Sequence, residues 1–282
     1  MANYALARYL ASRGEVHLVT NRAWSDLAAL PPAAVHRVPR PFGSNALGGV
    51  LLSREGARVW RQLAPRGVNA VVNGGNCQAG PLERPAINWV HYVHAAYVPE
   101  TAGSIARLAK TSLVHRRELK NERRAIRRAR LVICNSRRTR DDVIERLGVE
   151  PSRAHVVYYG IDAARFSAVS GDERAAAKRA FGVAPGRRLV GFAGALGDRR
   201  KAFDTVFAAW VELCRRPDWD ADLIVAGAGA ERPDWERRAK EAGLGARMRF
   251  IGFHIDMPAV FAALDALVHP ARYEAYGLSV HE

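Results

Sequence analysis

The chain has 282 residues, 49% of them apolar, and a formal net charge of +15 from 43 Lys and Arg against 28 Asp and Glu. This length suits one large domain or two ordinary ones, with enough apolar residues to fill their cores. The sequence has no low-complexity tract and no internal repeat, which excludes a disordered chain and a solenoid. The positive charge favours partners that carry phosphate, and an Arg-rich codon usage explains it equally well.

Cysteine spacing and apolar runs indicate the compartment. Cys77, Cys134 and Cys214 show no paired spacing and no His pattern beside them, so reduced structural thiols are expected. No apolar run approaches the roughly 18 residues that span a bilayer, and no signal peptide is visible. These features predict a cytoplasmic protein, with peripheral contact at the inner face of the plasma membrane as the membrane-bound alternative.

The first half of the chain alternates helices with short apolar strands. A helix over residues 4–12 ends before Gly14, and a strand over 15–20 follows. An α/β domain normally opens on a strand whose following turn binds a ligand, so the pattern predicts that the first strand and its turn are missing. The remaining predicted elements are strands over 68–73, 86–93, 130–135 and 154–159, and helices over 104–130 and 141–147.

The second half repeats this alternation after a junction within residues 163–187, which hold an amphipathic helix and a Pro185-Gly186 turn. Alternation in both halves predicts two facing Rossmann-like domains with parallel sheets, residues 1–165 and 166–282. The last helix begins near Leu278 and has about one turn, so further C-terminal helices are expected to be missing as well. The predicted strands here are 189–193, 221–226, 248–252 and 266–269, and the helices are 203–215, 234–242 and 258–264.

The segment 270–282, PARYEAYGLSVHE, carries the most specific pattern. A strand ends at Pro270, Glu274 lies in the loop, Gly277 permits a tight turn, and a helix begins. Free backbone N–H groups at a helix start suit a phosphate. Glu282 is then expected within reach of a nucleotide's ribose hydroxyls, and Glu274 near a sugar.

This segment resembles the Glu–seven residues–Glu motif of family 4 glycosyltransferases, P-S-x-x-E-x-x-G-hydrophobic-x-x-x-E, with the Ser changed to Ala271. The resemblance implies the GT-B fold and covers nearly all of the chain. It also implies that Glu274 contacts the donor sugar and Glu282 the ribose. Gly277 and Leu278, at the helix start, are the expected contacts of the donor diphosphate.

Residues 190–210, VGFAGALGDRRKAFDTVFAAW, resemble the opening of that family's C-terminal domain. Arg200 and Lys201 fall where the family places the cations of the donor diphosphate, and Gly194 is a further candidate contact. In a metal-free site, fixed cations must neutralise the departing diphosphate. Two positions depart from the family pattern: Ala195 replaces an Arg, and Ala202 replaces a Gly in what looks like a mild change.

The first half carries candidate residues for the transfer step. Residues 89–97, WVHYVHAAY, resemble a family strand that ends in a histidine facing the transferred sugar. His94, at the expected strand end, is the first choice and His91 the second, because a histidine there can hydrogen-bond a sugar hydroxyl. A buried structural histidine is the alternative for each. Ser136, in VICNS, matches a position that helps to order the cleft.

The resemblance implies a bacterial, retaining transferase that moves a hexose from a nucleoside diphosphate sugar to a hydroxyl of a glycan or lipid-linked acceptor in cell-envelope polysaccharide synthesis. It implies a route in which the leaving phosphate accepts the acceptor's proton, with no metal ion and no further cofactor. Asp220-Ala-Asp222 imitates a metal-binding D-x-D, but it precedes an interior strand and is interpreted as a solvated turn. Zinc spacings, a P-loop and a G-x-S-x-G elbow are absent from the sequence.

Residues 107–130 form a strongly basic helical pattern. It is either a solvated face or a surface that docks on an anionic membrane; nucleic-acid binding lacks a supporting motif. Two other functions stay open for the whole chain. One is an inactive or fragmentary GT-B relative that serves as a binding remnant, and the other is a GT-B sugar-nucleotide epimerase, which would turn over its donor without an acceptor.

Overall fold

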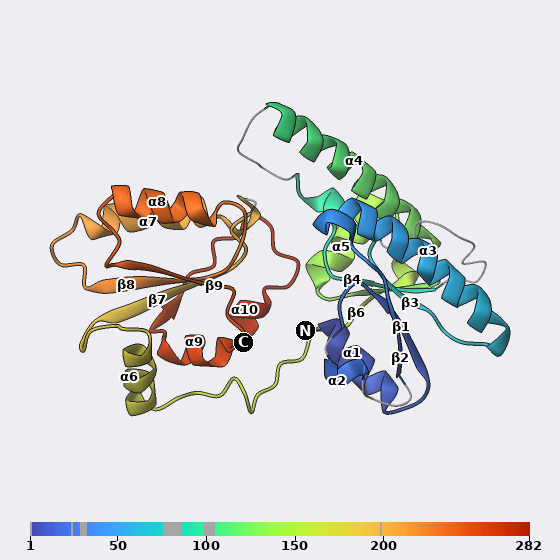
Figure 1. The fold of residues 1–282 in the computed structure, drawn as a ribbon, viewed down its shortest axis with the longest axis horizontal. Coiled ribbons are helices and arrows are strands. Elements are labelled where there is room, and N and C mark those ends of the chain that lie inside the picture. Colours follow the sequence, from blue (N-terminus) through green and yellow to red (C-terminus); the bar gives the residue numbers. More distant parts are fainter. Residues whose placement is uncertain (1, 24, 29–32, 76–85, 99–104, 198) are drawn as a thin grey trace. The chain divides into compact units, whose positions relative to one another are not determined.

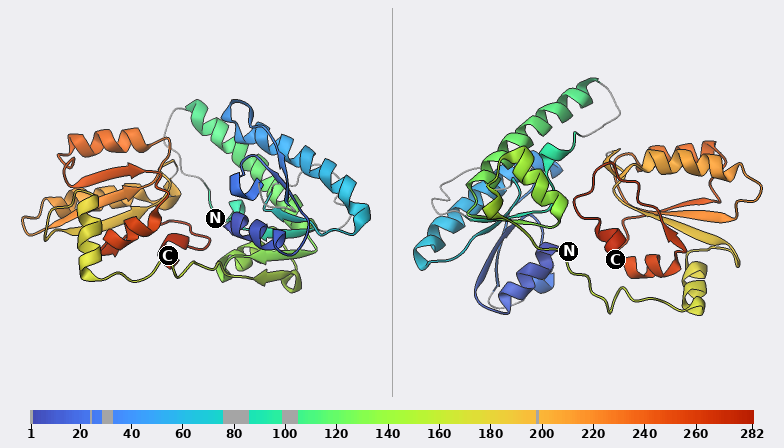
Figure 2. Two further views of the ribbon diagram at one scale, coloured as in Figure 1. Left: turned by 60° about the horizontal axis from the view of Figure 1, so that its bottom comes forward. Right: turned by 180° about the vertical axis from the view of Figure 1, so that it is seen from behind.

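The computed structural model describes residues 2–23, 25–28, 33–75, 86–98, 105–197 and 199–282. These residues fold into two compact units (Figures 1 and 2). Unit 1 contains the described residues up to Tyr159, and unit 2 begins at Gly160. Each unit is an α/β structure in which helices pack on parallel strands, which confirms the predicted fold class.

Unit 2 contains a four-stranded parallel sheet with the strand order β10-β7-β8-β9. Strand β8 is buried along its whole length, and its sequence ADLIVA is therefore almost continuously apolar instead of alternating. Strands β8 and β9 have the bounds that the sequence predicts. The four strands are β7 (Arg188–Ala193), β8 (Ala221–Ala226), β9 (Met248–Gly252) and β10 (Ala266–Leu267).

Helices cover both faces of this sheet, with α7 and α8 on one side and α6 and α9 on the other (Figure 1). Phe192, Phe203, Trp210 and Trp235 dominate the core under α7 and α8. A smaller cluster that includes Leu189 fills the space toward α6 and α9. The helical elements of unit 2 are α6 (Gly171–Ala180), η5 (Arg199–Lys201), α7 (Phe203–Cys214), α8 (Arg232–Glu241), α9 (Met257–Ala263) and α10 (Leu278–His281).

Unit 1 contains a second four-stranded parallel sheet, with the order β3-β4-β5-β6. Its core lies where β4 and β5 meet α4 and α5, and it includes the fully buried Val90, Ile126 and Val132. The elements are β3 (Val71–Asn73), β4 (Ile87–Val90), η3 (His94–Ala96), α4 (Ile105–Arg128), β5 (Leu131–Cys134), α5 (Arg137–Leu147), η4 (Pro151–Arg153) and β6 (Ala154–Val156).

A separate parallel pair, β1 and β2, completes unit 1 together with α1, α2 and α3. The sequence predicts α1 and β1 but nothing over residues 21–67, where the structure has a strand and a 19-residue helix. These elements are α1 (Ala2–Ala11), β1 (Val16–Thr20), α2 (Ser25–Ala28), β2 (Ala33–Arg37), η1 (Pro41–Gly43), α3 (Asn45–Leu63) and η2 (Ala64–Arg66).

All four strands of this sheet are shorter than predicted, and the early end of β4 moves a candidate residue. Strand β4 ends at Val90, not at residue 93, because its neighbours stop there. The last pair with β3 is at Trp89, and the last pair with β5 is at Val90. The prediction that His94 lies at a strand end is therefore wrong: His94 begins the helical turn η3. Strand β6 likewise ends at Val156, three residues before Tyr159.

Helix boundaries follow local capping. The pattern over residues 163–187 contains a helix only from Gly171 to Ala180, because Ser170 and Glu173 form a capping box at its start. In the described part of the chain, no helix is both long enough and apolar enough to cross a bilayer.

Candidate donor site and its surroundings

The candidate donor residues lie at the carboxyl ends of β7 and β10. The order β10-β7-β8-β9 reverses at the β7–β10 boundary, and ligands of open α/β sheets bind at such a reversal. The chain leaves β7 through η5, and it leaves β10 through the loop that contains Glu274. The topology of unit 2 alone therefore brings Arg200, Lys201 and Glu274 to one sheet edge.

Backbone and side-chain hydrogen bonds hold these two loops together. The Arg272 guanidinium donates to both carboxylate oxygens of Asp204 at 2.8 Å and to the Arg199 carbonyl at 2.7 Å. The Arg272 backbone N–H donates to the Arg200 carbonyl at 2.9 Å. Arg200 in turn donates to the Tyr273 carbonyl at 3.5 Å. The two loops are thus fixed relative to each other without any ligand.

Glu274 accepts two hydrogen bonds at one oxygen. Lys201 Nζ forms an ion pair with Glu274 Oε2, and His269 Nε2 lies 3.0 Å from the same oxygen. Burial alone would raise the pKa of Glu274, but the hydrogen bond and charge of Lys201, with Arg200 and His269 nearby, hold this pKa below its usual value. The carboxylate is therefore ionised at neutral pH beside a fixed cation.

The remaining donor candidates follow this loop. Gly277 has a φ of 82°, a left-handed conformation that favours glycine, and α10 begins at Leu278 directly after it. Glu282 lies at the end of α10, and burial raises its pKa above the usual value. Arg200, Lys201, Glu274, Gly277, Leu278 and Glu282 thus belong to two neighbouring segments of unit 2.

Gly194 has a packing role that the sequence does not reveal. Its N–H donates to the Ala226 carbonyl at 3.0 Å, and a Cβ built on Gly227 would lie 1.8 Å from the Gly194 carbonyl oxygen. A Cβ on Gly229 would lie 2.2 Å from the Leu196 carbonyl carbon. The glycines after β8 therefore allow the turns that follow β7 and β8 to touch through their backbones.

Two minor interpretations from the sequence need correction. Ala202 has a φ of 55° and is almost fully buried, so the change from glycine imposes a left-handed backbone on a residue with a side chain and is not mild. Asp222 is not part of a solvated turn. It is 3% exposed, and its carboxylate binds Arg187 at 2.7 Å and Arg249 at 3.1 Å, which fixes the start of β8.

In unit 1, a buried carboxylate orients His94. Glu122, on α4, is fully buried and accepts hydrogen bonds from His94 N–H at 2.8 Å and Ala95 N–H at 3.1 Å. The same carboxylate lies 3.0 Å from His94 Nδ1. Because a carboxylate accepts hydrogen bonds, Nδ1 is the donor in this contact and Nε2 is the ring nitrogen left for another partner. Glu122 therefore holds the His94 ring in one orientation at the start of η3.

His91 belongs to a different polar cluster. Its Nδ1 hydrogen-bonds the Tyr159 hydroxyl, and its Nε2 lies 2.9 Å from Asn3 Oδ1 and 3.2 Å from Asn73 Oδ1. The Trp89 ring packs against it, with ring centroids 4.6 Å apart. Burial lowers the pKa of His91 to about 4, so its ring is neutral at physiological pH.

This shift predicts a measurable pH dependence. The folded-state pKa lies below the unfolded value of about 6.5, so stability is complete above pH 6.5 and falls as the pH drops toward 4. We expect the free energy of unfolding of unit 1 to fall by roughly 2–3 kcal/mol across this window because of His91. Urea titrations of wild-type protein and His91→Gln at several pH values test this, and an equally steep loss in the variant contradicts it.

Ser136 and the cysteines have structural explanations. Ser136 is the N-cap of α5, and its hydroxyl accepts a hydrogen bond from the Thr139 N–H at 3.0 Å. Cys134 is a free thiol at the end of β5, and burial raises its pKa to about 12. Cys214 is also a free thiol. Cys77 lies outside the described residues, and within those residues no cluster of His, Cys, Asp and Glu could hold a metal ion.

Three contacts of the candidate residues escaped the sequence analysis: His269 with Glu274, Arg272 with Asp204, and Glu122 with His94. Arg272 lies inside the segment 270–282 that carries the Glu–seven residues–Glu motif, and His269 directly precedes that segment, so the signal was their proximity to Glu274 in the sequence. Asp204 follows Lys201 by three residues. Glu122 gave no signal, because a glutamate in an Arg-rich helix is typical of a solvated face.

Two Rossmann-like units with these loops define the class of GT-B glycosyltransferases. The chain belongs to Glycosyltransferase Family 4, whose family pattern matches residues 2–165, and residues 187–282 match Glycosyl transferases group 1. The family membership expected from the Glu–seven residues–Glu segment is thereby confirmed.

Several curated proteins are similar to this chain. The lipopolysaccharide core biosynthesis mannosyltransferase LpsB of Rhizobium meliloti is 34% identical over 179 residues, which are 61% of this chain and 48% of LpsB. The 2-deoxystreptamine N-acetyl-D-glucosaminyltransferase of Streptomyces fradiae is 33% identical over 179 residues, 60% of this chain and 40% of the relative. The chain thus spans about half the length, or less, of these relatives.

Solved structures confirm the fold. WaaG, a glycosyltransferase involved in lipopolysaccharide biosynthesis, superimposes with a TM-score of 0.72 at 20% identity over 98% of this chain and 72% of WaaG. HepE from Anabaena, in complex with UDP and glucose, superimposes with a TM-score of 0.68 at 20% identity over the same shares, 98% and 72%. At this identity the likeness establishes the GT-B fold alone.

Proposed function

We propose that the protein is a retaining glycosyltransferase that moves a hexose from a nucleoside diphosphate sugar to a hydroxyl of a glycan or lipid-linked acceptor. The observation that carries this proposal is the Lys201–Glu274 pair, held at the sheet reversal by the Arg272–Asp204 contacts. Related chains are named as a mannosyltransferase and an N-acetylglucosaminyltransferase, and the HepE structure holds UDP and glucose. These names favour a sugar nucleotide as the donor.

The proposed donor contacts use charges that are already in place. Lys201 and Arg200 neutralise the diphosphate as it departs, and the backbone N–H groups at Gly277 and Leu278 add partial positive charge. Glu274, released from part of its contact with Lys201, accepts hydrogen bonds from the sugar hydroxyls, and Glu282 accepts them from the ribose. In this proposal, fixed cations do the work that a metal ion does elsewhere, and no organic cofactor takes part.

The proposed transfer step keeps the configuration of the anomeric carbon. The acceptor oxygen bonds to that carbon, the carbon–oxygen bond to the diphosphate breaks, and the acceptor's proton passes to a diphosphate oxygen. His94 is proposed to hydrogen-bond the transferred sugar through Nε2, with Glu122 holding the ring through Nδ1. His91, Ser136 and Gly194 remain secondary candidates, because each already makes the internal hydrogen bonds described above.

The proposed setting is the cytoplasm of a bacterium, with the acceptor destined for cell-envelope polysaccharide. The free thiols of Cys134 and Cys214 and the lipopolysaccharide-related name of LpsB support it. A lipid-linked acceptor requires peripheral contact with an anionic membrane at its inner face, and the basic pattern of α4 is the surface that the sequence suggests. Nucleic acid is not a proposed partner.

A thermal-shift panel of UDP-, GDP- and ADP-sugars, each with and without EDTA, tests donor binding. A ligand that binds only the folded state raises the melting temperature by an amount that depends on its affinity. We expect one nucleotide series to stabilise the protein and EDTA to leave that shift unchanged. No shift with any sugar nucleotide favours a binding remnant, and conversion of a labelled donor to its epimer without an acceptor favours an epimerase.

A further inference from the structure

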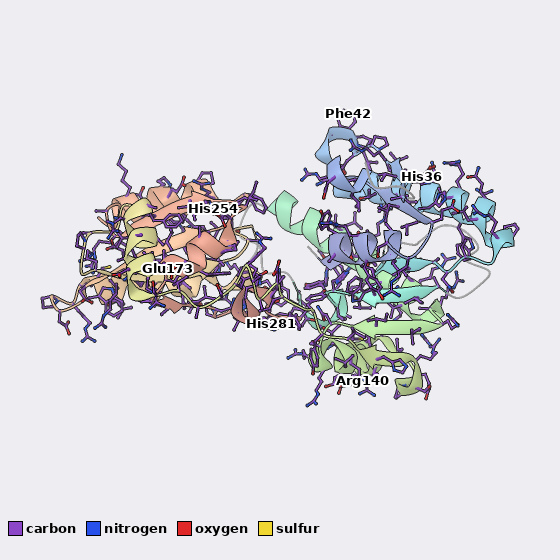
Figure 3. The ribbon with its side chains drawn as sticks, turned by 90° about the horizontal axis from the view of Figure 1, so that it is seen from below. His36, Phe42, Arg140, Glu173, His254 and His281 are labelled. Atoms are coloured by element: carbon purple, nitrogen blue, oxygen red, sulfur yellow. The ribbon has the colours of Figure 1, made fainter. Side chains whose placement is uncertain are left out.

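The turn η1 holds one aromatic side chain entirely in solvent. Phe42 is 99% exposed, and its backbone has a φ of 51° and a ψ of 25°, the left-handed region that bulky residues avoid. Hydrogen bonds on both sides fix this conformation, from Gly43 N–H to the Arg40 carbonyl at 3.1 Å and from Ser44 N–H to the Pro41 carbonyl at 2.9 Å. Phe42 therefore projects from a rigid turn at the edge of unit 1 (Figure 3).

Helix α3 begins directly after this turn, and one of its faces carries apolar side chains followed by cationic ones. Five side chains spaced alternately four and three residues apart share that face and form the α3 stripe. The two residues nearest Phe42 are leucines, with Leu47 48% exposed, and the next three are arginines. The opposite face is packed, as the 5% exposure of Val59 shows. The α3 stripe consists of Leu47, Leu51, Arg54, Arg58 and Arg61.

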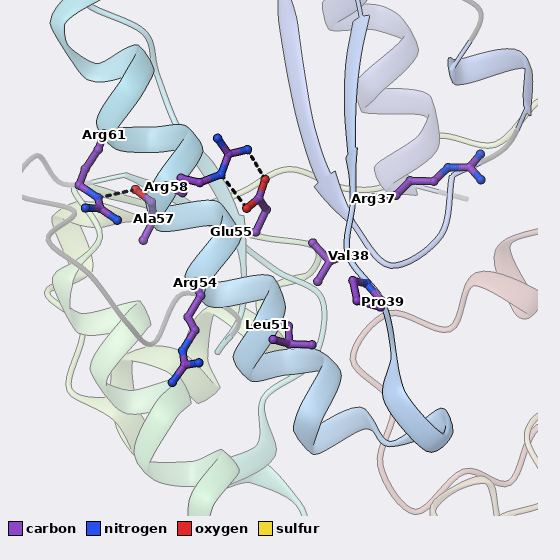
Figure 4. A pocket seen from close by; sticks show the side chains of 9 residues that line it. All are labelled: Arg37, Val38, Pro39, Leu51, Arg54, Glu55, Ala57, Arg58 and Arg61. Atoms are coloured by element: carbon purple, nitrogen blue, oxygen red, sulfur yellow. Dashed lines mark hydrogen bonds and ion pairs between the residues drawn. The ribbon is translucent and has the colours of Figure 1, made fainter.

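A basic hollow of about 680 Å³ lies along the stripe (Figure 4). Helix α3 supplies one wall, and Val38 and Pro39, which follow β2, supply the other. One carboxylate lines it, Glu55, which accepts two hydrogen bonds from Arg58 at 2.8 and 2.5 Å. The four lining arginines therefore leave an excess of positive charge; they are Arg37, Arg54, Arg58 and Arg61.

We infer that Phe42 and the α3 stripe form a surface that docks on an anionic lipid bilayer, with Phe42 inserted below the headgroups and the stripe arginines on lipid phosphates. The order of side chains matches the depth profile of one leaflet. Aromatic and aliphatic groups come first, and guanidinium groups follow after about two helical turns, or roughly 10 Å along the axis. Arginine suits this place because its planar donors match phosphate oxygens.

A nucleic acid or a protein partner fits this order less well. Single-stranded nucleic acid is bound by aromatic groups interleaved with cations along a groove, whereas here the exposed Phe42 precedes the α3 stripe and the stripe itself contains no aromatic residue. A protein interface concentrates aromatic anchors at a buried centre with a polar rim. The side chains of the α3 stripe change from apolar to cationic along one axis, which is the direction in which a leaflet changes from acyl chain to phosphate.

This inference deepens the proposed membrane contact and rests on it, but it moves the contact from α4 to α3. Flotation with vesicles of phosphatidylcholine, with and without phosphatidylglycerol, measures binding by the full chain. We expect binding only with phosphatidylglycerol, reduced by salt. Phe42→Gly should lose at least roughly tenfold in binding, while relief of the left-handed strain raises the melting temperature by about 2–4 °C. Phe42→Trp should keep the binding, and Phe253→Gly, which removes another exposed phenylalanine, should not weaken it.

Charge variants test whether α3 or α4 contacts the membrane. Arg54→Gln with Arg61→Gln should weaken vesicle binding roughly tenfold or more, because each arginine near an anionic surface contributes about fivefold. Arg116→Gln with Arg124→Gln removes the same charge from exposed positions of α4 and should leave binding near wild type. If the α4 double variant loses more binding than the α3 double variant, the assignment to α3 is wrong, whereas the proposed membrane contact is retained. Failure of the wild-type chain to bind anionic vesicles overturns both, whatever the donor panel shows.

Discussion

Lys201→Met is expected to lower kcat/KM for sugar transfer by roughly 10²–10³, because removing one preorganised donor from a developing anion costs about 3–4 kcal/mol of transition-state stabilisation. Methionine keeps much of the length and packing of the lysine stem and removes only the cation. In this variant only His269 and Arg200 remain near Glu274 among the described groups that lower its pKa. The pKa of Glu274 should therefore rise, because burial raises it and the main opposing effect, the Lys201 cation, is gone. Initial rates with a saturating acceptor and varied donor measure the loss.

Lys240→Met is the matched control. Lys240 lies exposed in the last turn of α8, so the same substitution removes a cation that no proposed step uses. Its kcat/KM should stay within twofold of wild type. Glu274→Gln together with Lys201→Met should lose less than the product of the two single effects, because the residues form one ion pair. Activity of Lys201→Met within tenfold of wild type rules out its role at the diphosphate.

Unit 2 was predictable because its central strand β8 is buried on both sides and its neighbours are rich in apolar residues. Strands such as β8 are continuous apolar runs, and glycine turns or polar helices separate them, so the pattern gives both type and position. The Glu–seven residues–Glu spacing then located Glu274. The contact of Lys201 with Glu274 follows from strand order, because the sheet places β10 beside β7 although 73 residues separate the two side chains.

Helix α3 was not predictable by the same reasoning. Gly48, Gly49 and Gly56 lower its intrinsic helix propensity, and packing of Val59 and its neighbours overrides that preference. Gly48 has a local reason, since a Cβ there would lie 3.0 Å from Arg40 Cγ, the stem that crosses the first turn. The end of β4 was also hidden, because Tyr92 and Val93 continue an apolar run after the neighbouring strands stop. Pairing partners, not composition, decide where such a strand ends.

Side-chain partners of the candidate site were the least predictable part. Glu122 and Asp222 are charged residues among many arginines, and sequence patterns assign such residues to solvent. In the structure each is buried because several donors meet it: the η3 turn for Glu122 and two guanidinium groups for Asp222. Those donors come from segments distant in sequence. The burial of Asp222 can be predicted only when the strand order is known, and that of Glu122 only when the turn after β4 is known.

Glu122→Ala is expected to destabilise unit 1 by about 3 kcal/mol, because it empties a fully buried site and leaves the part-buried His94 and Ala95 N–H groups without their acceptor. For a unit of this size the melting temperature should fall by roughly 10 °C. Glu145→Ala, on the exposed side of α5, removes the same side chain and should change stability by less than about 0.5 kcal/mol.

Glu122→Gln separates packing from charge at the same position. The amide keeps one acceptor oxygen but points an N–H₂ group at the remaining donors, so the cost should be intermediate, about 1–2 kcal/mol. Because Glu122 also holds the His94 ring through Nδ1, this variant should lower kcat more than it raises KM for the donor, whose proposed contacts lie in unit 2. Urea unfolding and steady-state kinetics on the same preparations test both effects. A glutamine variant as stable and active as wild type shows that water, not Glu122, accepts the hydrogen bonds of the N–H groups in the η3 turn.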